Sequence, residues 1–294
     1  MGSRHRIVWE KLSFDLKLLA AENPGSLAPV LIEINTLLED LESGEAIQRM
    51  LNFMAYELTA LSSELNEQDR FIFLNDYFFN RKGFQSRPPA DGALHSEDLL
   101  IRAVLQNKTG HPMVLALIYS HLATQIDIPV FLINLPCHSI LKWVRGGRSS
   151  YVDLTENGSL LEEGRLVELV NKNFCNDEDR KNESLDILPS KQVMQMYLTL
   201  LLDYFELGKN KNQLLLLYSI LLSLEPSNLK VLARRSLLLR EMGQTKRAIA
   251  DLKRYFSFID RSQSSPELQM AFLELQQLTE PDLFAPPSNN CYLH

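Results

Sequence analysis

The chain has 294 residues, of which 45% are hydrophobic, and this composition suits one or two packed cores and excludes a largely disordered protein. Lys and Arg number 30 against 37 Asp and Glu, so the net charge of −7 provides no basic surface for a nucleic-acid partner. The longest apolar run, from Leu214 to Leu222, has nine residues, whereas a membrane-spanning helix needs roughly 20, and we expect no contact with a membrane.

The first residues and the cysteines indicate the compartment. The charged start of the chain has no apolar stretch behind it that could act as a signal peptide, which predicts a cytoplasmic protein. Cys137, Cys175 and Cys291 are odd in number and widely spaced, and this pattern fits neither a disulfide framework nor a zinc site. We therefore expect reduced thiols, no metal ion and no cofactor.

The N-terminal part is predicted to be helical. Residues 8–62 place apolar side chains at helical spacing in three stretches, which are separated at Pro24-Gly25 and Ser43-Gly44. A fourth apolar stretch covers 71–79, and the residues around Pro88-Pro89 form a loop that ends this part.

Two further helices are predicted after that loop. Ser96 is expected to cap the first, over 97–107, because its hydroxyl can accept hydrogen bonds from the free amides of a helix start. Thr109-Gly110-His111-Pro112 opens the second, with proline at the first helical position, where no N–H is needed.

Runs of β-branched and aromatic residues then predict the only sheet, with strands over 130–134, 138–145 and 150–154. Gly146-Gly147 joins the last two strands as a hairpin. A turn centred there places Asp153 opposite Ile140 and makes His138 its diagonal neighbour, within reach of a side-chain hydrogen bond. Such a pair can orient an imidazole for general-base catalysis if a nucleophile is present, and otherwise it only stabilises the hairpin.

The C-terminal part is predicted to be helical again. Polar residues 171–182 are expected to form a solvated linker, and helices follow from Ser190. A weak repeat is typical of the second helix of a tetratricopeptide unit and consists of Gly243, Ala248, Leu252 and Tyr255 in one copy and Leu214, Tyr218 and Leu221 in the other.

Several short segments carry a resemblance to a known family. They are Leu74-Asn75-Asp76-Tyr77-Phe78-Phe79, Val104-Leu105, Thr109-Gly110-His111-Pro112, Ile128-Pro129, Leu135-Pro136-Cys137-His138 and Val152-Asp153. In this order and spacing they resemble the SirB-type transglutaminase-like proteins with a tetratricopeptide tail. The resemblance covers about residues 70–165, and the C-terminal helices extend it to about residue 280.

The resemblance implies a transglutaminase-like, papain-like core in which a cysteine at the start of the central helix is the nucleophile and later strands supply His and Asp. That position falls on Pro112 in this sequence, and proline cannot attack a carbonyl. The SirB-type branch commonly carries proline there as well, followed by a Ser-Leu pair, where this chain has Val114-Leu115. The chain thus departs further from hydroxyl or thiol chemistry.

Two residues beside this position have more than one interpretation. His111 lines the same cleft as Pro112 or is a solvent-facing cap of the helix. Cys137 is a cleft-lining thiol or a small buried hydrophobic residue, and its sulfur is expected to face away from the imidazole of His138 because consecutive strand residues point to opposite faces.

The predicted fold is therefore α+β and mostly helical, with a small antiparallel sheet. Its expected parts are a helical N-terminal region over 1–92, a transglutaminase-like core over 93–182, tetratricopeptide-like repeats over 183–282 and a flexible tail over 283–294.

Two functions from different classes remain open. The first is a non-catalytic scaffold or regulatory protein that binds a protein partner through the face formed by Lys230, Ala233, Leu237 and Arg240, unless that face packs on the core. The second is a cysteine- or hydroxyl-dependent hydrolase or acyl transferase that uses His138 and Asp153 with a nucleophile not yet identified.

Overall fold

The computed structural model describes residue 12 and residues 27–41, 44–87, 93–133, 135, 138–173 and 186–279. The chain forms two compact units, Met1–Tyr204 and Phe205–His294. The fold is mostly helical with small sheets, as the sequence predicts.

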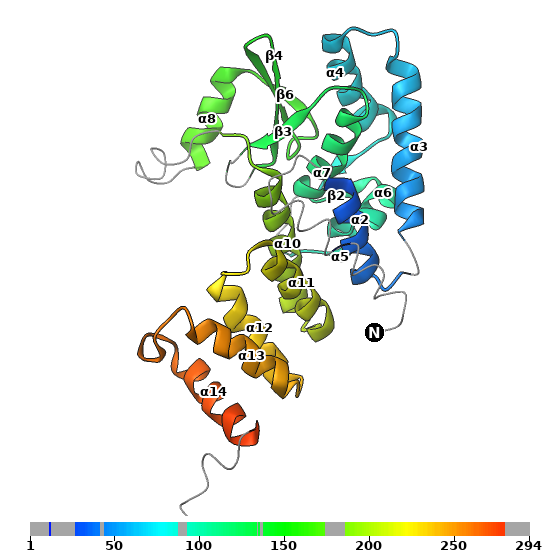
Figure 1. Ribbon diagram of the computed structural model, residues 1–294. Helices are drawn as coiled ribbons and strands as arrows, with labels where there is room; N and C mark the ends of the chain where they lie inside the picture. Colours follow the sequence, from blue (N-terminus) through cyan, green and yellow to red (C-terminus); the bar gives the residue numbers. More distant parts are fainter. Residues whose placement is uncertain are drawn as a thin grey trace, which may run out of the picture. The chain divides into compact units, whose positions relative to one another are not determined.

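Helix α7 (Pro112–Thr124) is a buried helix against which other helices of the first unit pack. Helix α7 contacts α2, α3, α6 and strand β3 (Figure 1), and ten of its side chains are buried. The other described helices of this unit are α2 (Leu27–Leu38), α3 (Glu45–Ser62), α4 (Glu67–Asp76), the π-helix η1 (Tyr77–Arg81), α5 (Ser96–Leu99), α6 (Ile101–Asn107), α8 (Glu163–Asn173) and α10 (Ser190–Leu207) as far as Tyr204.

The helix expected over 97–107 is two helices in the structure. The backbone of Leu100 is extended between α5 and α6, and the amide of Ile101 donates to Asn35 Oδ1 of α2 at 2.9 Å. The predicted cap is also wrong, because Ser96 is already helical and His95 precedes the helix without a capping side chain. A hydrogen bond from a residue distant in sequence explains the break.

The sheet has four antiparallel strands in the order β3-β4-β5-β6. Strands β3 (Val130–Ile133), β4 (Ile140–Arg145) and β5 (Arg148–Asp153) agree with the prediction, and the sequence missed β6 (Ser159–Leu161). The register confirms the Gly146-Gly147 hairpin and pairs Ile140 with Asp153. The sequence also missed a two-residue parallel pair, β1 (Gln85–Ser86) with β2 (Thr109–Gly110), so the four-stranded sheet is not the only one.

A buried polar network within the first unit joins α10 to α2 and α5 through Tyr197. The hydroxyl of Tyr197 donates to the carbonyl oxygen of Leu99 at 3.1 Å and accepts from Asn35 Nδ2 at 3.1 Å. Asn35 Nδ2 also donates to the carbonyl oxygen of Leu31 at 2.8 Å. Because Asn35 and Tyr197 are fully buried, these bonds offset the cost of removing their polar groups from water.

The second unit contains helices packed on their sequence neighbours. They are α11 (Lys211–Leu224), α12 (Leu229–Glu241), α13 (Thr245–Phe256), the short 3-10 helix η3 (Arg261–Gln263) and α14 (Pro266–Thr279). Arg235 of α12 donates to both carboxylate oxygens of Asp251 of α13, at 2.6 and 2.7 Å, and to Ser219 Oγ of α11 at 3.3 Å. This one side chain therefore connects three helices.

Some predicted segments fall outside the described residues. They include most of the first helix expected within 8–62, the loop around Pro88-Pro89, and the tail over 283–294. The predicted linker begins too early, because α8 continues through Asn173, and the rest of that segment up to residue 182 lies outside the described part. No helix within the described ranges is long and apolar enough to cross a membrane.

Candidate functional site

The structure brings His138 and Asp153 together at one end of the β4–β5 hairpin. His138 Nδ1 lies 3.1 Å from Asp153 Oδ2, as the hairpin register predicts, although His138 precedes the first residue of β4 by two positions. The Asp153 side chain is 1% exposed and that of His138 is 16% exposed. One ring edge thus faces a buried carboxylate.

The second oxygen of Asp153 is held by the turn that follows β5. Asp153 Oδ1 accepts from the amides of Thr155, at 2.8 Å, and Glu156, at 3.4 Å. A carboxylate can only accept, so Nδ1 of His138 donates the hydrogen and a neutral ring carries its lone pair on Nε2. The carboxylate therefore fixes the tautomer and the orientation of the imidazole.

The turn carrying these amides is anchored by the helix that precedes η1. Asn75 Nδ2 donates to the carbonyl oxygen of Gly158 at 2.8 Å, and Asn157 Oδ1 accepts from the amide of Ser86 at 2.6 Å. Gly158 has φ +79°, and a Cβ atom there would lie 2.1 Å from Phe79 Cε2. Sequence reasoning assigned no role to Asn75 or Gly158, although Asn75 belongs to a segment that carries the family resemblance.

His111 and Pro112 begin helix α7, as predicted. His111 is the N-cap residue, and its Nδ1 accepts from the amide of Met113 at 3.1 Å. The ring is partly buried and does not simply face solvent, and this burial lowers the pKa of His111 to about 4. Pro112 occupies the first turn as a buried residue.

In the described part of the chain, the imidazole of His138 forms a side-chain hydrogen bond only with Asp153. Within that part, no serine or threonine hydroxyl is hydrogen-bonded to the imidazole. Cys137, Cys175 and Cys291 all lie outside the described residues, so the orientation expected for the Cys137 sulfur is still a prediction. The described ranges also contain no cluster of three or more His, Cys, Asp or Glu side chains suited to a metal ion.

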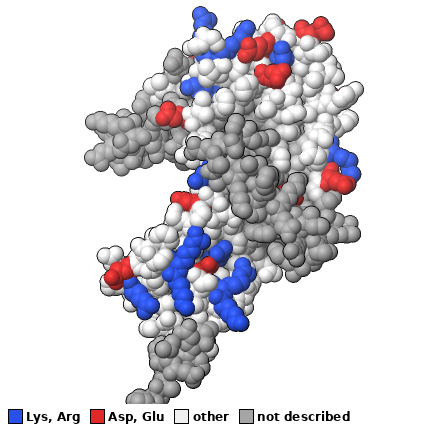
Figure 2. All heavy atoms as spheres, in the orientation of Figure 1, with Lys and Arg blue, Asp and Glu red and all other residues white. Residues whose placement is uncertain are grey.

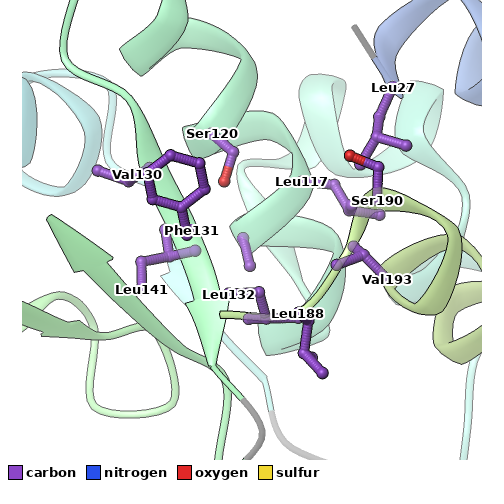
Figure 3. Close-up of a pocket in the computed structure, with 11 residues that line it drawn as sticks. Leu27, Leu117, Ser120, Val130, Phe131, Leu132, Leu141, Leu188, Ser190 and Val193 are labelled. Atoms are coloured by element: carbon purple, nitrogen blue, oxygen red, sulfur yellow. The ribbon is translucent and has the colours of Figure 1, made fainter. Parts of the chain in front are cut away.

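A small cavity in the first unit is separate from the His–Asp pair. It has a volume of about 80 Å³ and lies between α7, β3 and the segment that leads into α10 (Figure 3). Its lining is apolar except for the hydroxyls of Ser120 and Ser190, and none of His111, His138 and Asp153 contributes to it. At about 30 Å³ per water molecule, it has room for two or three waters and supplies no chemistry to the pair.

The predicted partner-binding residues of α12 differ in their surroundings. Lys230 is exposed, whereas Arg240 donates to Glu274 of α14 in an ion pair of 2.6 Å. Leu237 is half-buried and lines a hollow within the second unit. The three residues are therefore not equally available to a partner.

Comparison with known proteins identifies the family of the larger part of the chain. A model described as the transglutaminase-like superfamily matches residues 45–199. The UPF0162 protein of Haemophilus influenzae is 22% identical over 232 residues, which cover 76% of this chain and 83% of that protein.

A shorter match connects the chain to F-box only protein 21 of Mus musculus and Homo sapiens. Each is 32% identical over 57 residues, 19% of this chain, and the match spans only 9% of the F-box protein. No solved structure matches. Because the family model covers more than half of the chain, from α3 into α10, the protein belongs to the transglutaminase-like superfamily.

Proposed function

We propose that this protein is a non-catalytic, SirB-type member of its superfamily that acts in the cytoplasm as a scaffold or regulatory protein and binds a protein partner through its C-terminal helices. The papain-like core over 93–182 would support tetratricopeptide-like repeats over 183–282. The proposal rests on a proline at the position that the family resemblance gives to the nucleophile, and on the burial pattern of the C-terminal helices.

The observation that carries the proposal is Pro112 at the first position of α7. By the family resemblance this is the place of the attacking cysteine, and Met113 and Val114 beside it are buried and apolar. The next hydroxyls along the helix belong to Tyr119 and Ser120, about 10–12 Å further at 1.5 Å per residue. The first turn of α7 therefore offers no hydroxyl or thiol for attack.

The burial pattern of the C-terminal helices supports the repeat assignment. Ala248, Leu252 and Tyr255 are buried in α13, and Leu214 and Tyr218 are buried in α11. Burial at these spacings is what a tetratricopeptide-like register predicts, except that a small residue is usual at the position of Leu214. We infer that exposed side chains of the same helices are available for a partner.

The proposal is tested by activity and by partner recovery with the full-length protein. We expect no hydrolysis of amide or ester substrates above the rate of a His138→Ala variant. We also expect co-purification of a protein partner that a chain shortened after residue 207, which keeps α10 and the whole first unit, fails to recover. Turnover that depends on His138 would contradict the non-catalytic part, and equal recovery by both chains would contradict the role of the tail.

The second candidate is a cysteine- or hydroxyl-dependent hydrolase or acyl transferase. One observation favours it: the buried carboxylate of Asp153 orients the imidazole of His138, as in a general base. Labelling with an electrophilic thiol probe near neutral pH separates the candidates. If one cysteine is labelled rapidly in the unmodified protein and slowly in His138→Ala, the result favours the enzyme. Slow labelling of all three cysteines counts against a thiol mechanism.

A further inference from the structure

A hollow of about 450 Å³ lies within the second unit, between the C-terminal end of α10, the start of α11 and α12. We call it the C-terminal hollow. Four apolar or aromatic side chains (Leu214, Tyr218, Leu237 and Leu238) and five charged ones (Glu206, Lys209, Lys211, Arg234 and Glu241) line it. Its volume is within the range of about 300–1,000 Å³ that is usual for ligand sites.

The two acids of the hollow are already paired. Glu206 Oε1 accepts from Arg234, at 2.7 Å, and from the hydroxyl of Tyr218, at 2.8 Å. Glu241 pairs with Lys211 at 3.2 Å. Lys209 is exposed, and no carboxylate of the described residues forms an ion pair with it. One ammonium group therefore remains available at the rim.

The charge of the whole second unit has the same sign as that of Lys209. Residues 205–294 contain 11 Lys and Arg against 9 Asp and Glu, a net charge of +2, whereas residues 1–204 contain 19 against 28, a net charge of −9. Figure 2 shows Lys and Arg side chains gathered over the α12–α13 part of the surface. An acidic ligand is thus attracted to this unit and repelled by the other one.

We propose that the C-terminal hollow binds an extended segment of a partner protein in which a leucine-like side chain lies two residues from a carboxylate. The apolar side chain would enter between Leu214 and Leu237, and the carboxylate would pair with Lys209. In an extended chain, side chains two residues apart point the same way and are separated by about 7 Å, so one segment can reach both the floor and the rim. This assignment rests on the proposed function, because it names the chemistry of the partner.

The test uses the full-length protein and a fluorescein-labelled peptide that contains two copies of Ser-Asp-Ser-Leu. We expect saturable binding in fluorescence anisotropy, and about tenfold weaker binding when Lys replaces Asp or when Ser replaces Leu in the peptide. Equal binding of the Lys peptide, or no saturable binding of the Asp peptide, would overturn the assignment.

Matched variants locate the binding surface. Lys209→Glu and Leu237→Ser should each weaken binding about tenfold, and neither residue is fully buried, so both variants are expected to fold. The controls are Lys246→Glu, at an exposed position of α13, which changes the charge of the unit by the same amount and should weaken binding much less than Lys209→Glu, and Leu278→Ser, at a position of α14 that is 67% exposed, which should bind as the unmodified chain does. Equal loss in a variant and its control would place binding outside the hollow.

The result is distinguishable from a failure of the proposed function. If the peptide does not bind at the hollow, the expectation of no His138-dependent turnover still stands. Conversely, such turnover would contradict the scaffold proposal even if the peptide bound at Lys209 and Leu237.

Discussion

At the scale of single residues, His111 combines a structural role with a perturbed proton affinity. Its Nδ1 accepts the Met113 amide, and this bond requires the unprotonated ring. Burial lowers the pKa of His111 to about 4 in the folded protein, against an ordinary value of about 6.5 in the unfolded chain. The unfolded chain therefore binds a proton more readily between these two pH values.

This difference predicts an acid-sensitive contribution to stability from His111. The free energy of unfolding should fall as the pH drops below about 6.5 and level off near pH 4, with a maximal loss of about 3 kcal/mol from this group. His111→Asn keeps a capping oxygen and removes the titration, so its stability should depend less on pH. Urea unfolding of both proteins at several pH values checks this, and parallel curves would contradict it.

The turn that follows Asp153 requires glycine at position 158, because a side chain there would collide with Phe79. Gly158→Ala should lower the free energy of unfolding by at least about 2 kcal/mol, because it adds a collision with Phe79 to an unfavourable positive φ. Gly147→Ala is the matched control, since its φ is +77° and no atom lies within 4 Å of the added Cβ. The control should cost about 1–2 kcal/mol, and equal losses would show that the Phe79 contact is unimportant.

The pairing of His138 with Asp153 could be predicted from sequence, whereas the support around it could not. A two-glycine turn and the two-residue period of strands fix which residues face each other across a hairpin. The anchors of the turn, Asn75 and Ser86, are 83 and 71 residues from their partners. Contacts over such distances leave no local pattern in the chain.

At the scale of helices and strands, the buried hydroxyl of Tyr197 connects α10 to α2 and α5 within the first unit. Tyr197→Phe should lower the free energy of unfolding by about 1–3 kcal/mol, because the carbonyl oxygen of Leu99 loses its donor in a buried site. Tyr56→Phe is a suitable control because Tyr56 is 77% exposed, and it should change stability little. Denaturant unfolding of the two variants gives the comparison, and similar midpoints would contradict the role of the network.

The Arg235–Asp251 ion pair should dominate the stability of the second unit. Arg235→Met or Asp251→Asn should lower the free energy of unfolding by about 3–5 kcal/mol. The first change leaves the Asp251 carboxylate without its partner, and the second leaves the Arg235 guanidinium without a charged partner. A double variant, Arg235→Met with Asp251→Leu, should cost less than the two single changes together. The exposed pair of Arg49 and Glu45 is the control and should contribute no more than about 0.5 kcal/mol.

Helix boundaries show where periodicity ceases to be informative. The apolar pattern located α7 and its proline start, because both features are local. It joined α5 and α6 into one helix, because the bond from Ile101 to Asn35 that separates them comes from a residue of α2. The π-helix η1 was likewise not foreseen from the pattern over 71–79.

At the scale of the whole molecule, the chain combines a superfamily core with a second helical unit of opposite net charge. The family match covers residues 45–199, and the second unit begins at Phe205. The composition of the chain as a whole conceals this difference, because the net charge of −7 averages an acidic unit and a mildly basic one. Ligands attracted to the second unit should therefore bind more weakly as salt concentration rises.

The proline that begins α7 allows a test of the proposed site, because a cysteine can be introduced at that position. Pro112→Cys would add a thiol at the positive end of a 13-residue helix, and the loss of proline rigidity should cost only about 0.4–1 kcal/mol. The helix start lowers the pKa of this introduced thiol and apolar burial raises it, and we expect that pKa to rise in a Pro112→Cys, His138→Ala double variant if the proposed arrangement of the imidazole holds. Titrating the rate of alkylation against pH would measure both values. A pKa that depends on His138 would indicate that the imidazole lies beside the start of α7, and an unchanged pKa would contradict the arrangement on which the proposed function rests.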